Sequence, residues 1–278
     1  MNLNRLLIFS LILPFLGGFM YFGTGSAVKS AKAAQSVSES APESTSESII
    51  EAVPVVDVIE ETLGDHDGNV VVLELFSSQA CVFCPRADRI FADIASQDNV
   101  IGLACHVDYF DVRNGSLAQE FCTARQQWYM DHVFNSPLYT PQLVMNGRTD
   151  VVGYRLEQVV EQLQKEHRDH VNVPLDVIYE ADGTLVVTAP DDASFPADHT
   201  VWVMLYDDVH DLVIAQGRNK GQRVRYHRIV SAVKDAGRFE KPMSLDPDVK
   251  PGHAGAAVLV QDRVTGHILA AGRISFNR

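Results

Sequence analysis

Residues 70–96 read VVVLELFSSQACVFCPRADRIFADIAS, and this stretch decides the fold. Its first seven residues are apolar apart from Glu74, which is typical of a short strand buried on both faces. Residues 87–96 repeat apolar side chains at a helical spacing. Cys81 and Cys84 therefore fall between a buried strand and a helix.

This placement favours redox chemistry at the cysteine pair. We expect Cys81 to lie at the N-terminus of the helix, where unpaired backbone N–H groups and the helix dipole favour a thiolate. A thiol pKa near 8.5 can fall to about 3.5–7.5 in such a setting. Cys84, one turn further into the helix, would resolve a mixed disulfide. A lone CxxC also occurs in zinc sites, so the motif by itself leaves a metal site open.

A second candidate feature is Thr140-Pro141, which opens a strand and hairpin 60 residues after Cys81. Proline at the start of a strand is common, because no ladder donor is lost there. Together with the upstream cysteine pair, we interpret Pro141 as a cis-proline that faces the disulfide. Such a bond would leave the backbone of Thr140 free to pair with a bound peptide, and Pro141 would keep metal ions away from the thiols.

The remaining pattern predicts an α/β N-terminal domain followed by a mostly-β domain. A strand at 99–110, a helix at 117–133, a hairpin at 140–153 and a helix at 155–168 complete the first domain, for which we expect the bounds 52–170. Residues 171–278 contain short β-branched stretches separated by turns, which predicts a β-sandwich-like domain. Its strands are expected at 174–180, 184–189, 200–207, 212–216, 256–262 and 267–276, with one helix near 229–236.

The order of elements, the CxxC at a helix start and the Thr-Pro before the hairpin resemble the thioredoxin superfamily. More narrowly, the chain resembles the exported bacterial thioredoxin-like proteins of the DUF1223 family, a domain of unknown function. The resemblance begins near Val70, runs to the C-terminus and rests on ELFSSQ at 74–79, CPRAD at 84–88, HVDY at 106–109, TARQ at 123–126, YTPQ at 139–142 and, loosely, GRNKG at 217–221. It implies a thioredoxin-like fold and redox roles for Cys81, Cys84 and Pro141, but it gives no substrate.

Glu74 is a further candidate, because thioredoxin-like enzymes often bury a carboxylate beneath the cysteine pair. On this interpretation Glu74 would act as a general base for Cys84. It lies seven residues before Cys81, whereas six would be expected. The alternative is a glutamate at the end of a strand that faces solvent.

Cys105 and Cys122 lie outside the motif, where the family pattern has aromatic residues. They could be two buried free thiols, a structural disulfide, or part of a second relay or metal site. His106, beside Cys105 and near Asp108, is open to a copper or zinc interpretation or to an ordinary hydrogen-bonded role.

The N-terminus predicts export. Residues 1–33 combine one early charge, an apolar run at 6–22 and the sequence Ala-Lys-Ala at 31–33, which fits a signal peptide, with an uncleaved anchor as the alternative. Residues 34–51 are rich in Ser and Glu and are interpreted as a disordered linker. We therefore expect a periplasmic or otherwise extracytoplasmic protein that touches the membrane at most through this anchor.

The formal net charge of the chain is −13. Removal of residues 1–33 takes away three cations and no acid, which leaves 20 basic and 36 acidic residues, or −16. A surface of this sign argues against nucleic acid and anionic lipid as partners.

The sequence as a whole indicates an exported thiol–disulfide oxidoreductase without a cofactor or metal, which uses Cys81 and Cys84 on protein thiols or disulfides. The residues between the cysteines, Val82 and Phe83, include no basic group, which favours a reductase or isomerase over a strong oxidant. One alternative is a metal-handling protein that uses both cysteines with His106. Another is a non-catalytic exported binding module in which the disulfide is structural.

Overall fold

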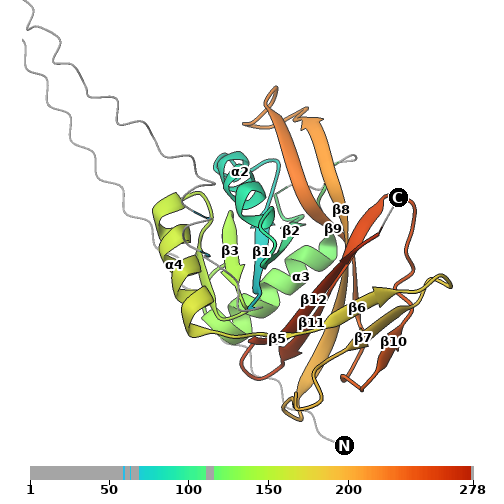
Figure 1. The fold of residues 1–278 in the computed structure, drawn as a ribbon. Coiled ribbons are helices and arrows are strands. Elements are labelled where there is room, and N and C mark those ends of the chain that lie inside the picture. Colours follow the sequence, from blue (N-terminus) through green and yellow to red (C-terminus); the bar gives the residue numbers. More distant parts are fainter. Residues whose placement is uncertain (1–58, 60–62, 64–68, 111–115, 277–278) are drawn as a thin grey trace, which may run out of the picture. The chain divides into compact units, whose positions relative to one another are not determined.

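The computed structural model describes Ile59, Leu63 and residues 69–110 and 116–276 (Figure 1). These residues belong to one compact unit that extends from residue 50 to residue 278. The expected leader at 1–33 and linker at 34–51 lie outside the described residues. Among the described helices, none is both long enough and apolar enough to cross a bilayer.

The first half of the unit has the predicted order of elements. Strand β1 (Val71–Ser77) leads to helix α2 (Cys84–Ala95), strand β2 (Val100–His106), helix α3 (Glu120–Tyr129) with a π-helical turn η1 (Met130–Phe134), the hairpin β3 (Gln142–Met145) and β4 (Thr149–Val152), and helix α4 (Leu156–Asp169). The strand order is β4-β3-β1-β2, in which β1 pairs in parallel with β2 and antiparallel to β3.

The side chains of β1 alternate between two cores, as the two-residue period of a strand requires. Leu73 and Leu75 pack with α2 and α4 on one face. Val72 and Phe76 pack with α3 on the other. The continuous apolar run of β1 is therefore explained by helices on both of its faces.

The second half continues the same sheet. Strands β8 (His199–Val213), β9 (Arg223–Asp235), β11 (His253–Asp262), β12 (Ile268–Ser275) and β5 (Val173–Pro174) extend it in the order β2-β9-β8-β11-β12-β5, which gives nine strands. The junction is a parallel pairing of β2 with β9 at Ala104 and Ile229. The expected boundary near residue 170 therefore does not separate two compact units.

A second sheet covers the far face of the C-terminal strands. It consists of β6 (Asp176–Tyr179), β7 (Leu185–Thr188) and β10 (Met243–Leu245) in the order β10-β7-β6. Apolar residues of both sheets form a third core between them. On its other face the large sheet encloses α3, because β8, β11 and β12 contribute to the same core as α3.

Two local predictions in the second half are wrong. The helix expected at 229–236 is absent, because residues 229–235 belong to β9, where pairing with β8 decides the structure. The strand expected at 200–207 extends further, as the 15-residue strand β8, which includes only the first two residues of the strand expected at 212–216. The outer parts of β8 and β9 project as a two-stranded arm, visible in orange in Figure 1.

Candidate functional site

The two cysteines lie in the turn between β1 and α2. Helix α2 begins at Cys84 with Phe83 as its N-cap, so Cys81 lies three residues before the first helical residue instead of at the helix start. Cys84 is fully buried, whereas Cys81 keeps 9% of its surface exposed, and Val82 and Phe83 between them are exposed. Both cysteines are free thiols. Cys81 is thus the more accessible of the two buried cysteines.

The surroundings of Cys81 stabilise its thiolate. A hydrogen bond from the Cys84 thiol is the largest influence, and it lowers the pKa of Cys81 from 9.0 to about 6 against the opposing effect of burial. Thr140 and the backbone N–H groups of Phe83 and Cys84 add to the lowering of this pKa. At neutral pH most of Cys81 is therefore the nucleophilic form.

The Thr140–Pro141 loop faces Cys81 as expected. The peptide bond is cis, and Cys81 Sγ lies 3.6 Å from the Thr140 carbonyl oxygen. Gln126 of α3 fixes the loop by donating from Nε2 to the Tyr139 carbonyl oxygen at 2.7 Å. The backbone N–H of Gly153 donates to the Pro141 carbonyl at 3.0 Å. The structure thus brings Cys81, Cys84, Thr140 and Pro141 together.

Asp88, which sequence reasoning missed, is the carboxylate that acts on Cys84. It follows Cys84 by one helical turn, and burial raises its pKa to about 8. Burial is also the main cause that raises the pKa of Cys84 well above its ordinary value, followed by the hydrogen bond to Cys81 and the charge of Asp88. The hydroxyl of Ser77, at the end of β1, opposes both of these pKa shifts. The spacing of four residues on one helix could have indicated this pair.

Glu74 is buried, so the solvent-facing alternative is wrong, but its carboxylate belongs to a different network. It pairs with Arg125 of α3, whose Nε and Nη2 both donate to it, and it accepts from the Tyr129 hydroxyl at 2.5 Å. Gln261 of β11 donates to the same hydroxyl at 3.0 Å. Glu74 lies on the α3 face of β1, so its predicted role as a base for Cys84 is not supported.

The tip of the β8–β9 arm also belongs to the site. Asn219, only 1% exposed, donates from Nδ2 to the carbonyl oxygens of Gln79 at 3.0 Å and Cys81 at 2.6 Å. The sequence contains GRNKG at this point, but nothing local indicates contact with a motif 138 residues earlier. The second half of the chain thus fixes the backbone of the reactive cysteine.

Cys105 and Cys122 form a disulfide that joins β2 to α3, which resolves the alternatives left open by the sequence. His106 is buried, and its ring lies edge-on to Tyr226. Within the described residues, no group of three or more His, Cys, Asp or Glu side chains is arranged to hold a metal ion.

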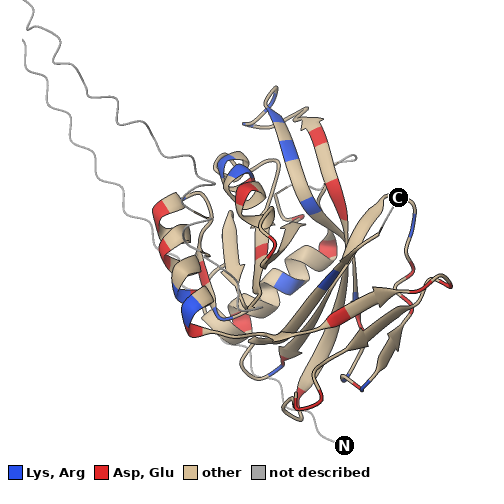
Figure 2. Cartoon of the chain, viewed as in Figure 1, with Lys and Arg blue, Asp and Glu red and all other residues tan. Residues whose placement is uncertain are grey.

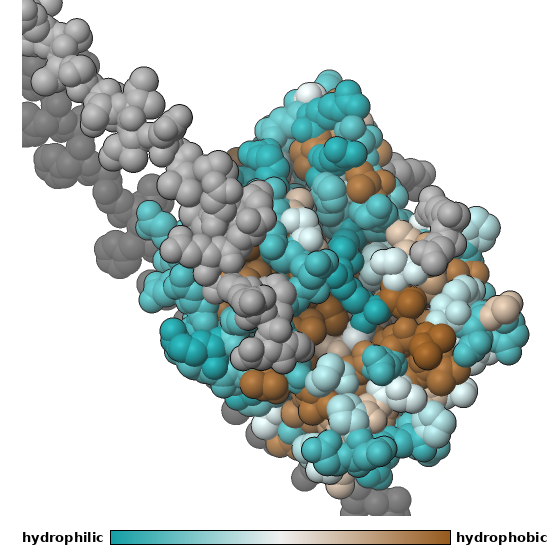
Figure 3. Space-filling view, in the orientation of Figure 1, coloured by the Kyte–Doolittle hydropathy of each residue, from teal (hydrophilic) through white to brown (hydrophobic). Residues whose placement is uncertain are grey.

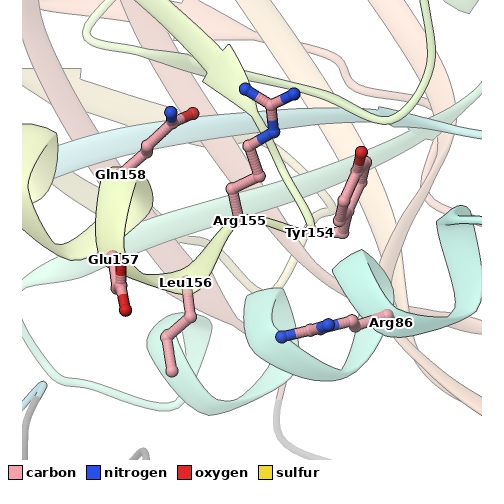
Figure 4. A pocket seen from close by; sticks show the side chains of 6 residues that line it. All are labelled: Arg86, Tyr154, Arg155, Leu156, Glu157 and Gln158. Atoms are coloured by element: carbon pink, nitrogen blue, oxygen red, sulfur yellow. The ribbon is translucent and has the colours of Figure 1, made fainter.

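A pocket of about 370 Å³ lies next to the motif (Figure 4). Arg86 reaches it from the first turn of α2, and the other lining residues come from the segment that enters α4: Tyr154, Arg155, Leu156, Glu157 and Gln158. The ring of Tyr154 stacks on exposed Phe83, with centroids 4.8 Å apart. Tyr154 therefore connects the lining of the pocket with the turn that carries Cys81.

Fold and site together define a protein with a paired-cysteine site on a mixed α/β sheet. Residues 72–261 match the family described as a protein of unknown function, DUF1223, and the chain belongs to this family. This confirms the family resemblance found in the sequence. The match extends across the position at which a domain boundary was expected.

A crystal structure of protein AGR_C_4864 from Agrobacterium tumefaciens is similar to this chain, with a TM-score of 0.64 and 26% sequence identity. The alignment covers 77% of this chain and 97% of that one. A comparison with curated proteins gave no match.

Proposed function

We propose that this protein is a thioredoxin-like thiol–disulfide oxidoreductase that acts outside the cytoplasm. The observation that supports this most directly is the reachable Cys81 thiolate facing the Thr140–Pro141 loop, with Cys84 and Asp88 buried behind it. The element order from β1 to α4 supports the thioredoxin-like assignment. The leader-like composition of residues 1–33 supports export.

In the first step the Cys81 thiolate attacks one sulfur of a client disulfide. A mixed disulfide forms, and the other client sulfur leaves as a thiolate. The backbone N–H of Thr140 forms no backbone hydrogen bond among the described residues, so it is available to pair with the client chain. Protein thiols and disulfides are accordingly the proposed partners.

In the second step Cys84 resolves the mixed disulfide. Once Cys81 is bonded to the client, it no longer carries the charge that raises the pKa of Cys84. The Asp88 carboxylate takes the proton of Cys84, whose sulfur attacks that of Cys81 and expels the second client sulfur. Two electrons pass from the cysteine pair to the client, and Asp88 returns the proton to a departing client thiolate. Exchange with an external dithiol regenerates the reduced pair.

Two measurements test the proposal. The reduction potential of the Cys81–Cys84 pair should lie between about −270 and −120 mV, whereas a value well below about −300 mV would indicate a structural disulfide. A Cys84→Ala variant, expressed with its N-terminal segment, should accumulate mixed disulfides through Cys81 in the cell envelope. The Cys81→Ala/Cys84→Ala double variant is the control. Failure of the single variant to capture more protein than this control would refute the proposal.

A further inference from the structure

Four cations lie close to the motif along the chain, each within two residues of a group that belongs to the motif or contacts it, and two of them line the neighbouring pocket. Arg86 follows Cys84 by two residues, and Arg155 follows Tyr154, which stacks on Phe83. Arg218 and Lys220 flank Asn219, whose amide holds the Cys81 carbonyl. We call Arg86, Arg155, Arg218 and Lys220 the cationic rim.

The charges of the rim are available to a partner. All four side chains are exposed, and within the described part of the chain none of them forms an ion pair with a carboxylate. Arg223, further along the arm, differs because Asp211 neutralises it at 2.8 Å. Glu157 is the acid that lines the pocket beside Arg86 and Arg155. The pocket still carries more positive than negative charge.

This arrangement departs from the charge of the molecule as a whole. The chain carries 36 acidic and 23 basic residues, yet Figure 2 shows Lys and Arg on α2 and at the outer end of the β8–β9 arm, with acidic residues on α2 and on β8 beside them. Figure 3 shows the same end as mostly hydrophilic, with a few apolar residues among the polar ones. Unpaired cations near a reactive site attract an anionic chain.

We propose that the cationic rim selects clients whose reactive disulfide lies in an acidic polypeptide segment. This inference rests on the proposed function and names its substrate class. A polypeptide fits better than a small molecule, because the rim cations come from three separate elements, with Arg86 and Arg155 in the pocket and the other two at the tip of the arm. Acidic side chains before and after the client cysteine would contact the arm tip and the pocket in turn.

The test uses four disulfides reacting with the reduced protein: dimers of short cysteine peptides flanked by Glu, Gln or Lys, and glutathione disulfide. Acid-quenched mass spectrometry follows oxidation of the Cys81–Cys84 pair, and each rate is divided by the rate of the same disulfide with dithiothreitol. The rim predicts that the Glu peptide reacts about tenfold faster than the Lys peptide at low ionic strength, with the difference shrinking at high salt. The net charge of the protein alone predicts the opposite order.

Double variants at the pocket and at the tip of the arm locate the effect. Arg86→Glu/Arg155→Glu and Arg218→Glu/Lys220→Glu should each lower the rate for the Glu peptide about tenfold, and Arg218→Gln/Lys220→Gln should give an intermediate rate. Lys165→Glu/Arg168→Glu, at the other end of α4, makes the same change in net charge and should preserve the order. Far-UV circular dichroism verifies that each variant is folded.

Several outcomes would overturn the inference. A faster reaction with the Lys peptide, or rim variants that behave like the α4 control, would eliminate the rim as a selector. If glutathione disulfide reacts fastest of the four, the proposed substrate class would change from an acidic polypeptide to a small anionic disulfide. Absence of reaction with all four disulfides would refute the proposed function as well, whereas equal rates for the three peptides would refute only the role of the rim.

Discussion

The hydrogen bond between the two thiols gives Cys81 a testable pH dependence. The pKa of Cys81 is lowered to about 6, so its thiolate is present above pH 6 and is lost as the pH falls through that value. Alkylation by iodoacetamide, followed by mass spectrometry, should rise with a midpoint near pH 6 instead of 9.0. In Cys84→Ala the midpoint should move upward, because the largest cause of the lowering is gone.

The other cysteines do not complicate this measurement. Cys84 is buried with a raised pKa, and Cys105 and Cys122 are bonded to each other. A single alkylated site is therefore expected at neutral pH. An unchanged midpoint in Cys84→Ala would show that some other group stabilises the thiolate.

Asp88 should reduce stability in a defined pH window. Its pKa is near 3.8 when unfolded and about 8 in the folded protein, so the folded state binds the extra proton and the free energy of unfolding falls as the pH rises from about 4 to 8. Asp88→Asn should stabilise the protein by on the order of 5 kcal/mol at pH 8 and by little near pH 4. Denaturant unfolding at both pH values measures this.

The same variant should slow the resolving step. Without the carboxylate, closure of the Cys81–Cys84 disulfide from a mixed disulfide should slow by at least about tenfold at pH 7. Asp169→Asn, on the exposed end of α4, is the matched control and should change neither property. Destabilisation by Asp88→Asn at pH 8 would contradict a raised pKa.

These two carboxylates illustrate what the sequence reveals about single residues. Strand alternation places Glu74 on the α3 face of β1, while helical spacing places Asp88 next to Cys84. Both periods can be read from the sequence. To decide which of the two acids acts on Cys84, it was also necessary to know that Glu74 pairs with Arg125. This arginine lies on a different element, 51 residues later in the sequence.

At the scale of elements, the arm formed by β8 and β9 is the feature that fixes the reactive turn. Asn219→Ala removes two donated hydrogen bonds and leaves two carbonyl oxygens in need of a donor, which should cost about 1–3 kcal/mol of stability. Asn219→Asp should cost more, because a carboxylate oxygen would then face both carbonyls. The pKa of Cys81 should rise in both variants as the turn loosens and its backbone N–H groups lose their alignment.

A neighbouring residue provides the control for this prediction. Gln222 donates to Asn219 Oδ1 at 3.3 Å from the same loop, and among the described residues it has no hydrogen bond to the cysteine turn. Gln222→Ala should leave the alkylation midpoint of Cys81 near pH 6. A purely structural role for Asn219 would lower the unfolding midpoint in its variants without moving the pH profile.

The elements themselves were predictable where local patterns were strong. The spacing of apolar residues indicated α2 and α4, and Asn146-Gly147 indicated the turn between β3 and β4. Residues 229–236 were misassigned because short β-branched runs fit both helix and strand, and only the partner strand β8 decides between them. Non-local pairing is the information that the local pattern lacks.

At the scale of the whole molecule, the two halves share their cores. Ile214, Val224, Tyr226 and Ile229 of the arm pack with α2 and β1. The buried network of Glu74 and Arg125 reaches Gln261 of β11. The change to short β-branched stretches after residue 170 suggested two domains. Composition does not reveal that β2 and β9 are neighbouring strands of one sheet.

This continuity predicts that residues 50–278 unfold as one unit. The chain contains two tryptophans, Trp128 in α3 and Trp202 in β8, one in each half. In Trp128→Phe the remaining fluorescence reports the second half, and in Trp202→Phe it reports the first. Within each variant, the urea midpoint from fluorescence should coincide with that from far-UV circular dichroism, as all-or-none unfolding requires.

A fragment of residues 52–170 should aggregate, because it exposes the edge of β2 and the apolar surface of α3. Separate midpoints, or a soluble, cooperatively folded fragment, would instead establish two domains.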